Sequence, residues 1–332
     1  MGRFGVSPTR NKQSGYRPAR VTVAVLTFIP ELEGYYRHRL EVLRVCLESI
    51  LRNTDGEYDL IVFDNGSCQP VQEYLAGLRD AGKIDILMLS ARNLGKIGAL
   101  QVLFNAAPGE LIAYCDDDIL FHPGWLPAHL EIFDTYPNVG MVSGLPVRSA
   151  YGRAATANQA WMASHPPDLH VTEQRWIPDE WERDWALSTG RDPDELFESQ
   201  RAQADLKFEM NRVEAYPAAN HFQFLAPRTV LLQAIPGEWT GKLMGNMVEL
   251  DQAVDAQGCL RLSTAQRYVR HIGNVVSPAL AAEVREIGID VHGRVVARRP
   301  RRHWLLYIPR MRPLLKKLYG KLYDILHHVS DE

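Results

Sequence analysis

The sequence predicts an α/β fold in which a mostly parallel central sheet is flanked by helices. Short apolar, β-branched runs alternate with segments of helical periodicity at intervals of about 25 to 30 residues, the spacing of strand–helix–strand units. Acidic residues at 64 and at 116–118 directly follow two of these runs, and parallel sheets bind ligands at the carboxyl ends of their strands. With 332 residues, 46% of them hydrophobic, the chain can bury one large core or two smaller ones.

Each element is assigned from the composition and periodicity of its residues. In the first half of the chain we expect strands at 21–28, 58–64, 83–90, 110–116 and 138–144, and helices at 39–53, 70–82, 98–107 and 127–137. In the second half we expect a strand and a helix within 221–235, a helix at 247–258 that Gly258 ends, and one or two strands within 260–274.

These elements divide the chain into five parts. The expected parts are a flexible segment at 1–20, the first half of the α/β domain at 21–147, an insertion at 148–217, the second half of the domain at 218–290, and a basic amphipathic tail at 291–332. The alternating pattern breaks in the insertion, where we expect short helices.

The tail concentrates positive charge. Ten of the 37 Lys and Arg lie between Arg294 and Lys321 without one acidic residue, so 27 remain elsewhere to face 40 Asp and Glu. The apolar residues of 314–329 form one stripe opposite lysines, which suits a helix on an anionic membrane surface. Docking on the protein's own body or on a dimer partner suits the stripe equally well. The tail offers no recognised nucleic-acid-binding module.

The remaining composition predicts a cytoplasmic protein, peripheral on the inner face of the membrane if the tail binds lipid. The sequence contains no run of 18 apolar residues, so we expect no membrane-spanning helix. Residues 1–20 lack the apolar core of a secretory signal. The four cysteines form no CxxC pair, which indicates free thiols.

The stretch YCDDDILFHPGW places three aspartates side by side at a strand end. Neighbouring carboxylates repel by about 1 kcal/mol per pair even in water, so a cation is expected among them. In an extended segment the side chains of Asp116 and Asp118 point the same way, and hard oxygen ligands suit Mg²⁺ or Mn²⁺ that share phosphate ligands with a substrate. The alternative is an acidic cap on the following helix, but Pro123 and Gly124 separate the triplet from that helix.

Four segments in this order resemble the nucleotide-sugar half of glycosyltransferase family 2, which has the GT-A fold. The segments are VTVAVLTF, LIVFDNGS, NLGKIGAL and YCDDDILFHPGW, and the resemblance covers about residues 21–145 and resumes at about 220–275. It implies transfer of a sugar, with inversion, from a UDP-, GDP- or dTDP-linked donor to a glycan or lipid-linked acceptor, as in cell-surface polysaccharide synthesis. It also implies a DxD-type motif that holds the divalent cation, Mn²⁺ or Mg²⁺.

The resemblance implies roles for particular residues. Residues expected at the nucleotide sugar are Thr27, Asp64, Asn65, Asn93, Gly95, Lys96, Asp116 and Asp117. Those expected at the metal are Asp116, Asp118 and His271. His271 ends a late strand, where similar enzymes place a metal-binding histidine; otherwise it is a structural residue. Lys96 is expected to face a phosphate as a point charge.

The catalytic base is where the sequence departs from the family pattern. Inverting transfer needs a carboxylate that takes the proton of the acceptor hydroxyl. The family's Glu-Asp pair falls on Asn246 and Met247, which cannot serve, and the nearest acids are Glu249 and Asp251. If neither acid reaches the acceptor, the chain follows a retaining path or is a non-catalytic sugar-nucleotide-binding or scaffold protein of the same fold.

Two further expectations concern the acceptor and a competing class of enzyme. In this family the region that corresponds to 148–217 shapes acceptor binding. In this chain that region contains tryptophans at 161, 176, 181 and 185, which either stack on sugar rings or, more often for such residues, belong to the core. A sugar nucleotidyltransferase would need a Gly-rich loop after the first strand, and LTFIPELEGYYRHR is not one.

Overall fold

A computed structural model describes residues 7, 9–237, 247–291, 295 and 318 of the chain. Contacts divide the chain into a unit at Met1–Val296 and a second unit at Ala297–Glu332, and the fold given below is that of the first. The expected helical stripe at 314–329, apart from Leu318, lies outside the described residues, as does Asn246. Within the described part, no helix is long and apolar enough to cross a bilayer, and all four cysteines are free.

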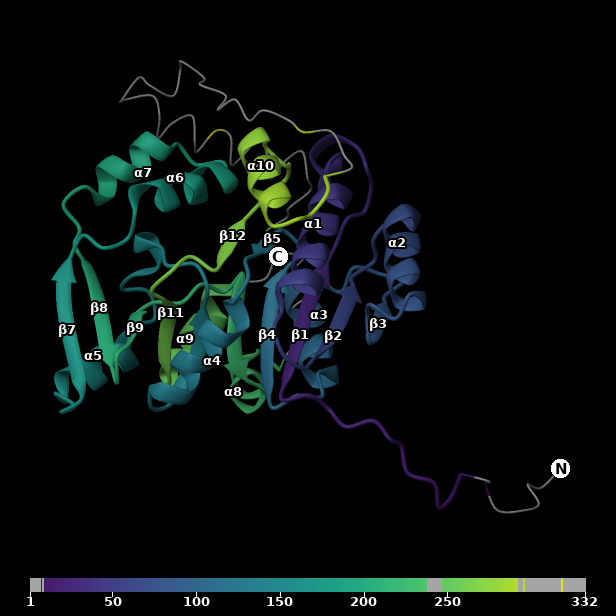
Figure 1. Ribbon diagram of the computed structural model, residues 1–332, viewed down its shortest axis with the longest axis horizontal. Helices are drawn as coiled ribbons and strands as arrows, with labels where there is room; N and C mark the ends of the chain where they lie inside the picture. The colour runs from purple at the N-terminus through teal and green to yellow at the C-terminus, as the bar shows by residue number, and fades with distance from the viewer. Residues whose placement is uncertain (1–6, 8, 238–246, 292–294, 296–317, 319–332) are drawn as a thin grey trace. The chain divides into compact units, whose positions relative to one another are not determined.

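The core of the fold is one ten-stranded sheet (Figure 1). In spatial order its strands are β3 (Ile86–Leu89), β2 (Tyr58–Asp64), β1 (Val21–Thr27), β4 (Leu111–Asp116), β10 (Gln223–Pro227), β6 (Val139–Ser143), β11 (Leu260–Thr264), β9 (Val213–Tyr216), β8 (Asp205–Met210) and β7 (Leu169–Gln174). Among the first seven, β10 alone runs against the others. The predicted mostly parallel α/β sheet is therefore confirmed.

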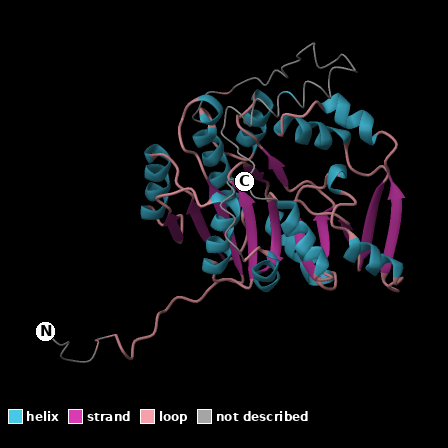
Figure 2. Cartoon of the chain, turned by 180° about the vertical axis from the view of Figure 1, so that it is seen from behind, coloured by secondary structure: helices cyan, strands magenta, loops and turns pink. Residues whose placement is uncertain are grey.

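Helices cover both faces of this sheet (Figures 1 and 2). They are η1 (Gly34–Tyr36), α1 (Arg39–Asn53), α2 (Gln69–Asp80), α3 (Gly95–Ala106), α4 (Trp125–Thr135), η2 (Arg148–Ala150), α5 (Thr156–Ala163), α6 (Asp179–Ser188), α7 (Pro193–Gln200), α8 (Arg228–Ala234), α9 (Met247–Ala256) and α10 (Pro278–Glu286). Helices α1, α2 and α4 pack on one face, and α3, α8 and α9 on the other.

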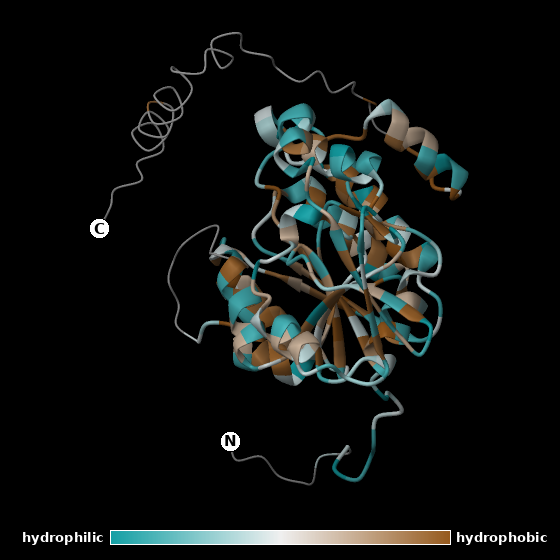
Figure 3. Ribbon diagram, turned by 90° about the vertical axis from the view of Figure 1, so that its left-hand side faces the viewer, coloured by the Kyte–Doolittle hydropathy of each residue, from teal (hydrophilic) through white to brown (hydrophobic). Residues whose placement is uncertain are grey.

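Alternation along the strands produces the two-sided core. In β1, Val23 and Val25 pack with the α1 face, whereas Ala24 and Leu26 pack with the α3 face. All four side chains are buried, and full burial of one Val or Leu side chain contributes about 1.5–3 kcal/mol. Hydrophobic residues accordingly concentrate along the strands, while the outer faces of the helices are mixed (Figure 3).

Residues 148–217 contain more than the short helices that the sequence predicts. Strands β7, β8 and β9 also form here, and β9 pairs with β11, so the segment extends the central sheet. The sequence pattern does not reveal β7 because five of its six side chains are exposed and no apolar alternation marks it. The insertion is thus built partly from the edge of the main sheet.

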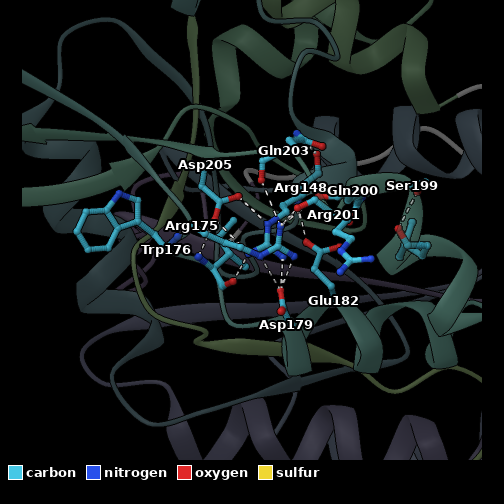
Figure 4. A network of polar contacts seen from close by, with 12 residues as sticks. Arg148, Arg175, Trp176, Asp179, Glu182, Ser199, Gln200, Arg201, Gln203 and Asp205 are labelled. Carbon is cyan, nitrogen blue, oxygen red and sulfur yellow. Dashed lines mark hydrogen bonds and ion pairs between the residues drawn. The ribbon is translucent and has the colours of Figure 1, made fainter.

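A buried arginine ties the insertion together (Figure 4). Nε of Arg148 donates to Oδ1 of Asp205 at 2.8 Å, and its Nη1 donates to Oδ1 of Asp179 at 3.0 Å. The backbone N–H of Arg148 also donates to Glu182, whose pKa is raised by burial. A buried arginine needs a hydrogen-bond acceptor for each of its donors, and Arg148 finds them on α6 and β8. These bonds therefore join the start of the insertion to both elements.

His129 on α4 is held in its neutral form. Its Nδ1–H donates to the carbonyl of Trp125 at 2.6 Å, and its Nε2 accepts from Nε2 of Gln223 at 3.1 Å. The amide of Gln223 is fixed in this direction because its oxygen accepts from the backbone N–H of Gly144. Burial lowers the pKa of His129 from 6.5 to about 4.

We expect His129 to make the protein sensitive to acid. The unfolded state takes up a proton near pH 6.5 and the folded state only near pH 4, so the free energy of unfolding falls by about 3 kcal/mol as pH drops through this window. Denaturant unfolding of the wild type and His129→Gln across that range measures the effect. The pH dependence of the variant should be shallower by this amount; parallel curves would show that His129 does not carry it.

Candidate functional site

Three parallel strands end together at one edge of the sheet. Thr27 at the end of β1 pairs in register with Asp64 at the end of β2, and Leu26 pairs with Asp116 at the end of β4. The carboxyl ends of parallel strands meet by construction, so the polar residues that follow them become neighbours. The predicted placement of both acidic clusters at strand ends is confirmed.

Two of the predicted nucleotide-binding segments are joined by amide hydrogen bonds. Nδ2 of Asn65 donates to Oδ1 of Asn93 at 2.9 Å, and the same oxygen accepts from the N–H of Gly95 at 2.8 Å. Asp64 is fully buried and accepts from the N–H of Ser67 at 3.1 Å, which closes the turn after β2. Asp64 and Asn65 therefore shape the loops, while Asn93 stays partly exposed at the edge.

A close approach of these loops requires glycine at position 66. Gly66 has φ +92°, and a Cβ there would lie 3.0 Å from the carbonyl carbon of Arg92 and 3.1 Å from the amide nitrogen of Asn93. Any larger residue would push the two loops apart, because both contacts are to backbone.

Asp116 binds a lysine. Nζ of Lys96, in the first turn of α3, lies 2.8 Å from both carboxylate oxygens of Asp116. The hydroxyl of Tyr114 also donates to this carboxylate, and the pKa of that buried phenol is well above its usual range. About a quarter of the Asp116 side chain and a fifth of the Lys96 side chain remain exposed, so this pair faces outward from the edge.

Asp117 and Asp118 share one buried arginine that the sequence does not single out. Arg39, the first residue of α1, donates from Nη1 to Oδ2 of Asp118 at 2.8 Å and from Nη2 to Oδ1 of Asp117. The other oxygen of Asp117 accepts from the hydroxyl of Thr27 at 2.6 Å. Arg39 and Lys96 thus supply two of the positive charges that three adjacent carboxylates need.

The expected convergence of Asp116 and Asp118 is wrong. Strand β4 ends at Asp116, and Asp117 and Asp118 form a turn before the short strand β5 (Ile119–Phe121). The alternation that would turn side chains i and i+2 the same way applies to extended backbone only. Asp117 and Asp118 therefore share Arg39, while Asp116 turns to Lys96.

The pKa values of the two inner aspartates move in opposite directions. Burial raises the pKa of Asp117 to about 6, against the lowering effect of Arg39. Burial also favours the neutral form of Asp118, but the charges of His271 and Arg39 outweigh it and lower the pKa of that carboxyl. Asp118 is therefore the more firmly ionised of the two and the better ligand for a cation.

A second, two-stranded sheet brings His271 to the triplet. Strand β12 (Val269–His271) pairs antiparallel with β5, and His271 stands opposite Ile119. The backbone N–H of Ile272 donates to the carbonyl of Asp118 at 2.7 Å. As a result, Nε2 of His271 lies 3.6 Å from Oδ2 of Asp118, although 153 residues separate the two in sequence.

The residues present fit a divalent cation that has two protein ligands. Among the described side chains, Oδ1 of Asp118 and Nδ1 of His271 are buried without a hydrogen-bond partner. A carboxylate and an imidazole suit Mn²⁺, which fills its other positions with phosphate and water oxygens. The described residues contain no group of three His, Cys, Asp or Glu that would hold an ion alone, in keeping with the separation of Asp116 from Asp118.

Of the two acids expected as base, Asp251 is buried and Glu249 is exposed. Both lie on α9 (Met247–Ala256). Asp251 is 0% exposed; its Oδ2 meets Nδ1 of His221 at 2.9 Å, and its Oδ1 pairs with Nη2 of Arg261 at 2.6 Å. An acid covered in this way presents no surface to an acceptor.

Aromatic rings border the histidine. Trp185 of α6 stacks on Phe222 with 4.9 Å between ring centroids, and His271 packs edge-on against both rings. Trp161 instead packs with Tyr136 and Phe208 in the core. One tryptophan of the insertion therefore reaches the site, and another belongs to the core.

The comparisons with known proteins point to one family. Residues 35–187 match the family model described as Glycosyl transferase family 2. The chain is 28% identical over 115 residues to the uncharacterized glycosyltransferase alr2836 of Nostoc sp., a match that covers 35% of each protein. The match thus spans about a third of that relative's length.

Solved structures also match parts of the chain. The S. aureus TarS fragment 1–349 is 13% identical, covers 81% of this chain and 64% of its own, and has a TM-score of 0.44. The mannosyltransferase PcManGT from Pyrobaculum calidifontis, in complex with GDP-Man and Mn²⁺, is 24% identical over 39% of this chain and 36% of its own, with a TM-score of 0.32. Residues 35–187, which contain the aspartate triplet, thus match glycosyl transferase family 2; together with the curated relative, this match confirms the resemblance seen in the sequence and supports a transferase.

Proposed function

We propose that the chain is a metal-dependent glycosyltransferase that moves a sugar, with inversion, from a UDP-, GDP- or dTDP-linked donor to a glycan or lipid-linked acceptor. The observation that carries the proposal is the pair of Asp118 and His271 at the carboxyl edge of the sheet, each of which has one buried polar atom without a hydrogen-bond partner among the described residues. In a family 2 domain this edge is where a nucleotide sugar is expected.

The roles of the individual residues follow from their exposure and charge. Asp118 and His271 would hold the divalent cation, which neutralises the departing diphosphate when bound. Lys96, balanced by Asp116 in this structure, would turn to a phosphate as a point charge. Asn93 and Gly95 would line the nucleotide, and the buried Thr27, Asp64 and Asn65 would fix the loops around it.

The charges at the edge support an anionic donor. Three carboxylates face Arg39 and Lys96, so the cluster keeps one net negative charge when all three are ionised and His271 is neutral, as a metal ligand must be. A divalent ion reverses that sign and makes the edge attractive to a diphosphate. Trp185, which stacks on the buried Phe222 and is itself partly exposed, then offers an aromatic ring of the kind on which sugar rings stack.

Nucleoside diphosphate release tests this function. The wild-type protein is incubated with UDP-, GDP- and dTDP-linked sugars, in the presence of Mn²⁺ or of EDTA. We expect one class of donor to be turned over, and EDTA to abolish the reaction. If a donor binds but no donor is turned over, the chain is instead a non-catalytic binding or scaffold protein. Met247, which occupies the family's usual base position, is the argument for that alternative. No binding of any donor would contradict both functions.

A further inference from the structure

A histidine–aspartate pair borders the candidate site. His221 lies in the loop before β10, and its Nδ1 is 2.9 Å from Oδ2 of Asp251 on α9. Asp251 is itself fixed by an ion pair with Arg261, whose side chain is 1% exposed. The His221 side chain keeps 26% of its surface exposed, so within this cluster the imidazole is the group that a substrate can reach.

The backbone holds His221 at the same strand end as the aspartate triplet. The next residue, Phe222, accepts a 2.9 Å hydrogen bond through its carbonyl from the backbone N–H of Asp116. Its ring packs against His271 and Trp185. His221 is therefore one residue from a direct contact with the proposed donor site.

The residues before His221 are fixed as well. The carbonyl of Ala219 accepts from Nη2 of Arg261 at 2.8 Å, and Nδ2 of Asn220 donates to the carbonyl of Leu145 at 2.7 Å. Hydrogen bonds on both sides of His221 make its backbone rigid, which is the condition for a group that must meet a substrate in one geometry.

The pair also sets the tautomer of His221. An ionised Asp251 can only accept a hydrogen bond, so Nδ1 of His221 carries the proton and donates it. Nε2 then keeps its lone pair, and it forms no hydrogen bond with the residues that the structure describes. This is the arrangement of a histidine base that a buried carboxylate orients.

We propose that His221 is the general base of the transfer and that Asp251 is its positioning residue, an inference that rests on the proposed glycosyltransferase function. The acceptor oxygen forms a bond to the anomeric carbon while the bond from that carbon to the diphosphate oxygen breaks, and its electron pair leaves with the diphosphate. The acceptor proton passes to Nε2 of His221, and the imidazolium is stabilised by Asp251. Asp251 thus acts through His221, and the missing Glu-Asp pair of the family is no obstacle to inversion.

Chemical rescue of a histidine variant tests the proposal. In His221→Ala we expect the transfer rate constant to fall by about 10²- to 10⁴-fold, the usual contribution of a general base, with unchanged affinity for the donor. Added imidazole should restore part of the rate in His221→Ala, whose cavity admits it, and none in His221→Phe, whose ring fills the cavity. His170→Ala, which removes an exposed histidine on β7, should behave as the wild type.

Two results would overturn the role of His221. One is a rate in His221→Ala within about tenfold of the wild type. The other is a loss of activity in both variants that imidazole restores no more in His221→Ala than in His221→Phe. A structural defect would respond to imidazole equally in the two variants. Failure of the underlying function is distinguishable, since the wild type would then bind or turn over no nucleotide sugar.

Discussion

Asp118→Asn is expected to weaken Mn²⁺-dependent binding of the nucleotide-sugar donor by at least about 100-fold. Loss of a residue that only supports a metal ligand costs about 10- to 100-fold in metal affinity, and Asp118 is proposed as a ligand itself. Asparagine keeps the shape of the side chain but removes the charge that His271 and Arg39 stabilise. Titration calorimetry with each nucleotide, with and without Mn²⁺, measures the effect.

Asp134→Asn is the matched control for this variant. Asp134 is also an aspartate that pairs with an arginine, Arg20, but about half of its side chain is exposed and it lies on α4, away from the triplet. Its replacement should leave donor binding unchanged. Equal donor affinity in Asp118→Asn and the wild type would remove Asp118 from the cation site.

Arg39→Met is expected to lower the free energy of unfolding by about 3–5 kcal/mol. Arg39 is the cation shared by Asp117 and Asp118, and all three side chains are nearly buried. Removal of one partner from a buried ion pair leaves a charge that neither water nor protein compensates. Methionine keeps much of the volume of arginine, so the loss reports charge rather than packing. Denaturant unfolding without added metal measures it.

Arg20→Met provides the comparison for Arg39. Its pair with Asp134 is exposed on both sides, and such pairs contribute about 0–1 kcal/mol. If Arg39→Met were no more destabilising than Arg20→Met, the three aspartates would not depend on a resident cation, and the electrostatic description of the site would fail.

The sequence predicted the parts of the site that depend on strand ends. Asp64 ends β2 and Asn65 follows it, and the order of apolar runs is enough to place both at the edge of a parallel sheet. Asn93, which follows β3 and bonds to Asn65, is expected from the resemblance. His271 is expected from the resemblance, at the end of a late strand where similar enzymes place a metal-binding histidine, and its role as a ligand stays a prediction. Its pairing with Asp118 further depends on β5, a three-residue strand too short to stand out in the pattern.

Arg39 was not predicted, although α1 contains a signal for it. Arg39 lies on the buried face of this helix, in line with Leu43 and Cys46 at the helical spacing. A charged residue on an apolar stripe needs a buried partner of opposite sign, and the triplet offers two.

No sequence pattern indicates the pair of His221 and Asp251. These residues are 30 positions apart on a loop and a helix, and neither disturbs a periodic pattern. Only the packing of α9 against the sheet, which the sequence does not specify at this precision, brings them together.

The central claim is that Asp118 and His271 hold a cation together with the donor's diphosphate. Pulsed electron paramagnetic resonance of bound Mn²⁺ tests this claim most directly. In the complex of the wild-type protein, Mn²⁺ and the nucleoside diphosphate that binds best, we expect couplings of the manganese to phosphorus and to one imidazole nitrogen. The nitrogen coupling should disappear in His271→Gln and persist in His221→Gln. A manganese spectrum with phosphorus coupling but no protein nitrogen in the wild type would contradict the account.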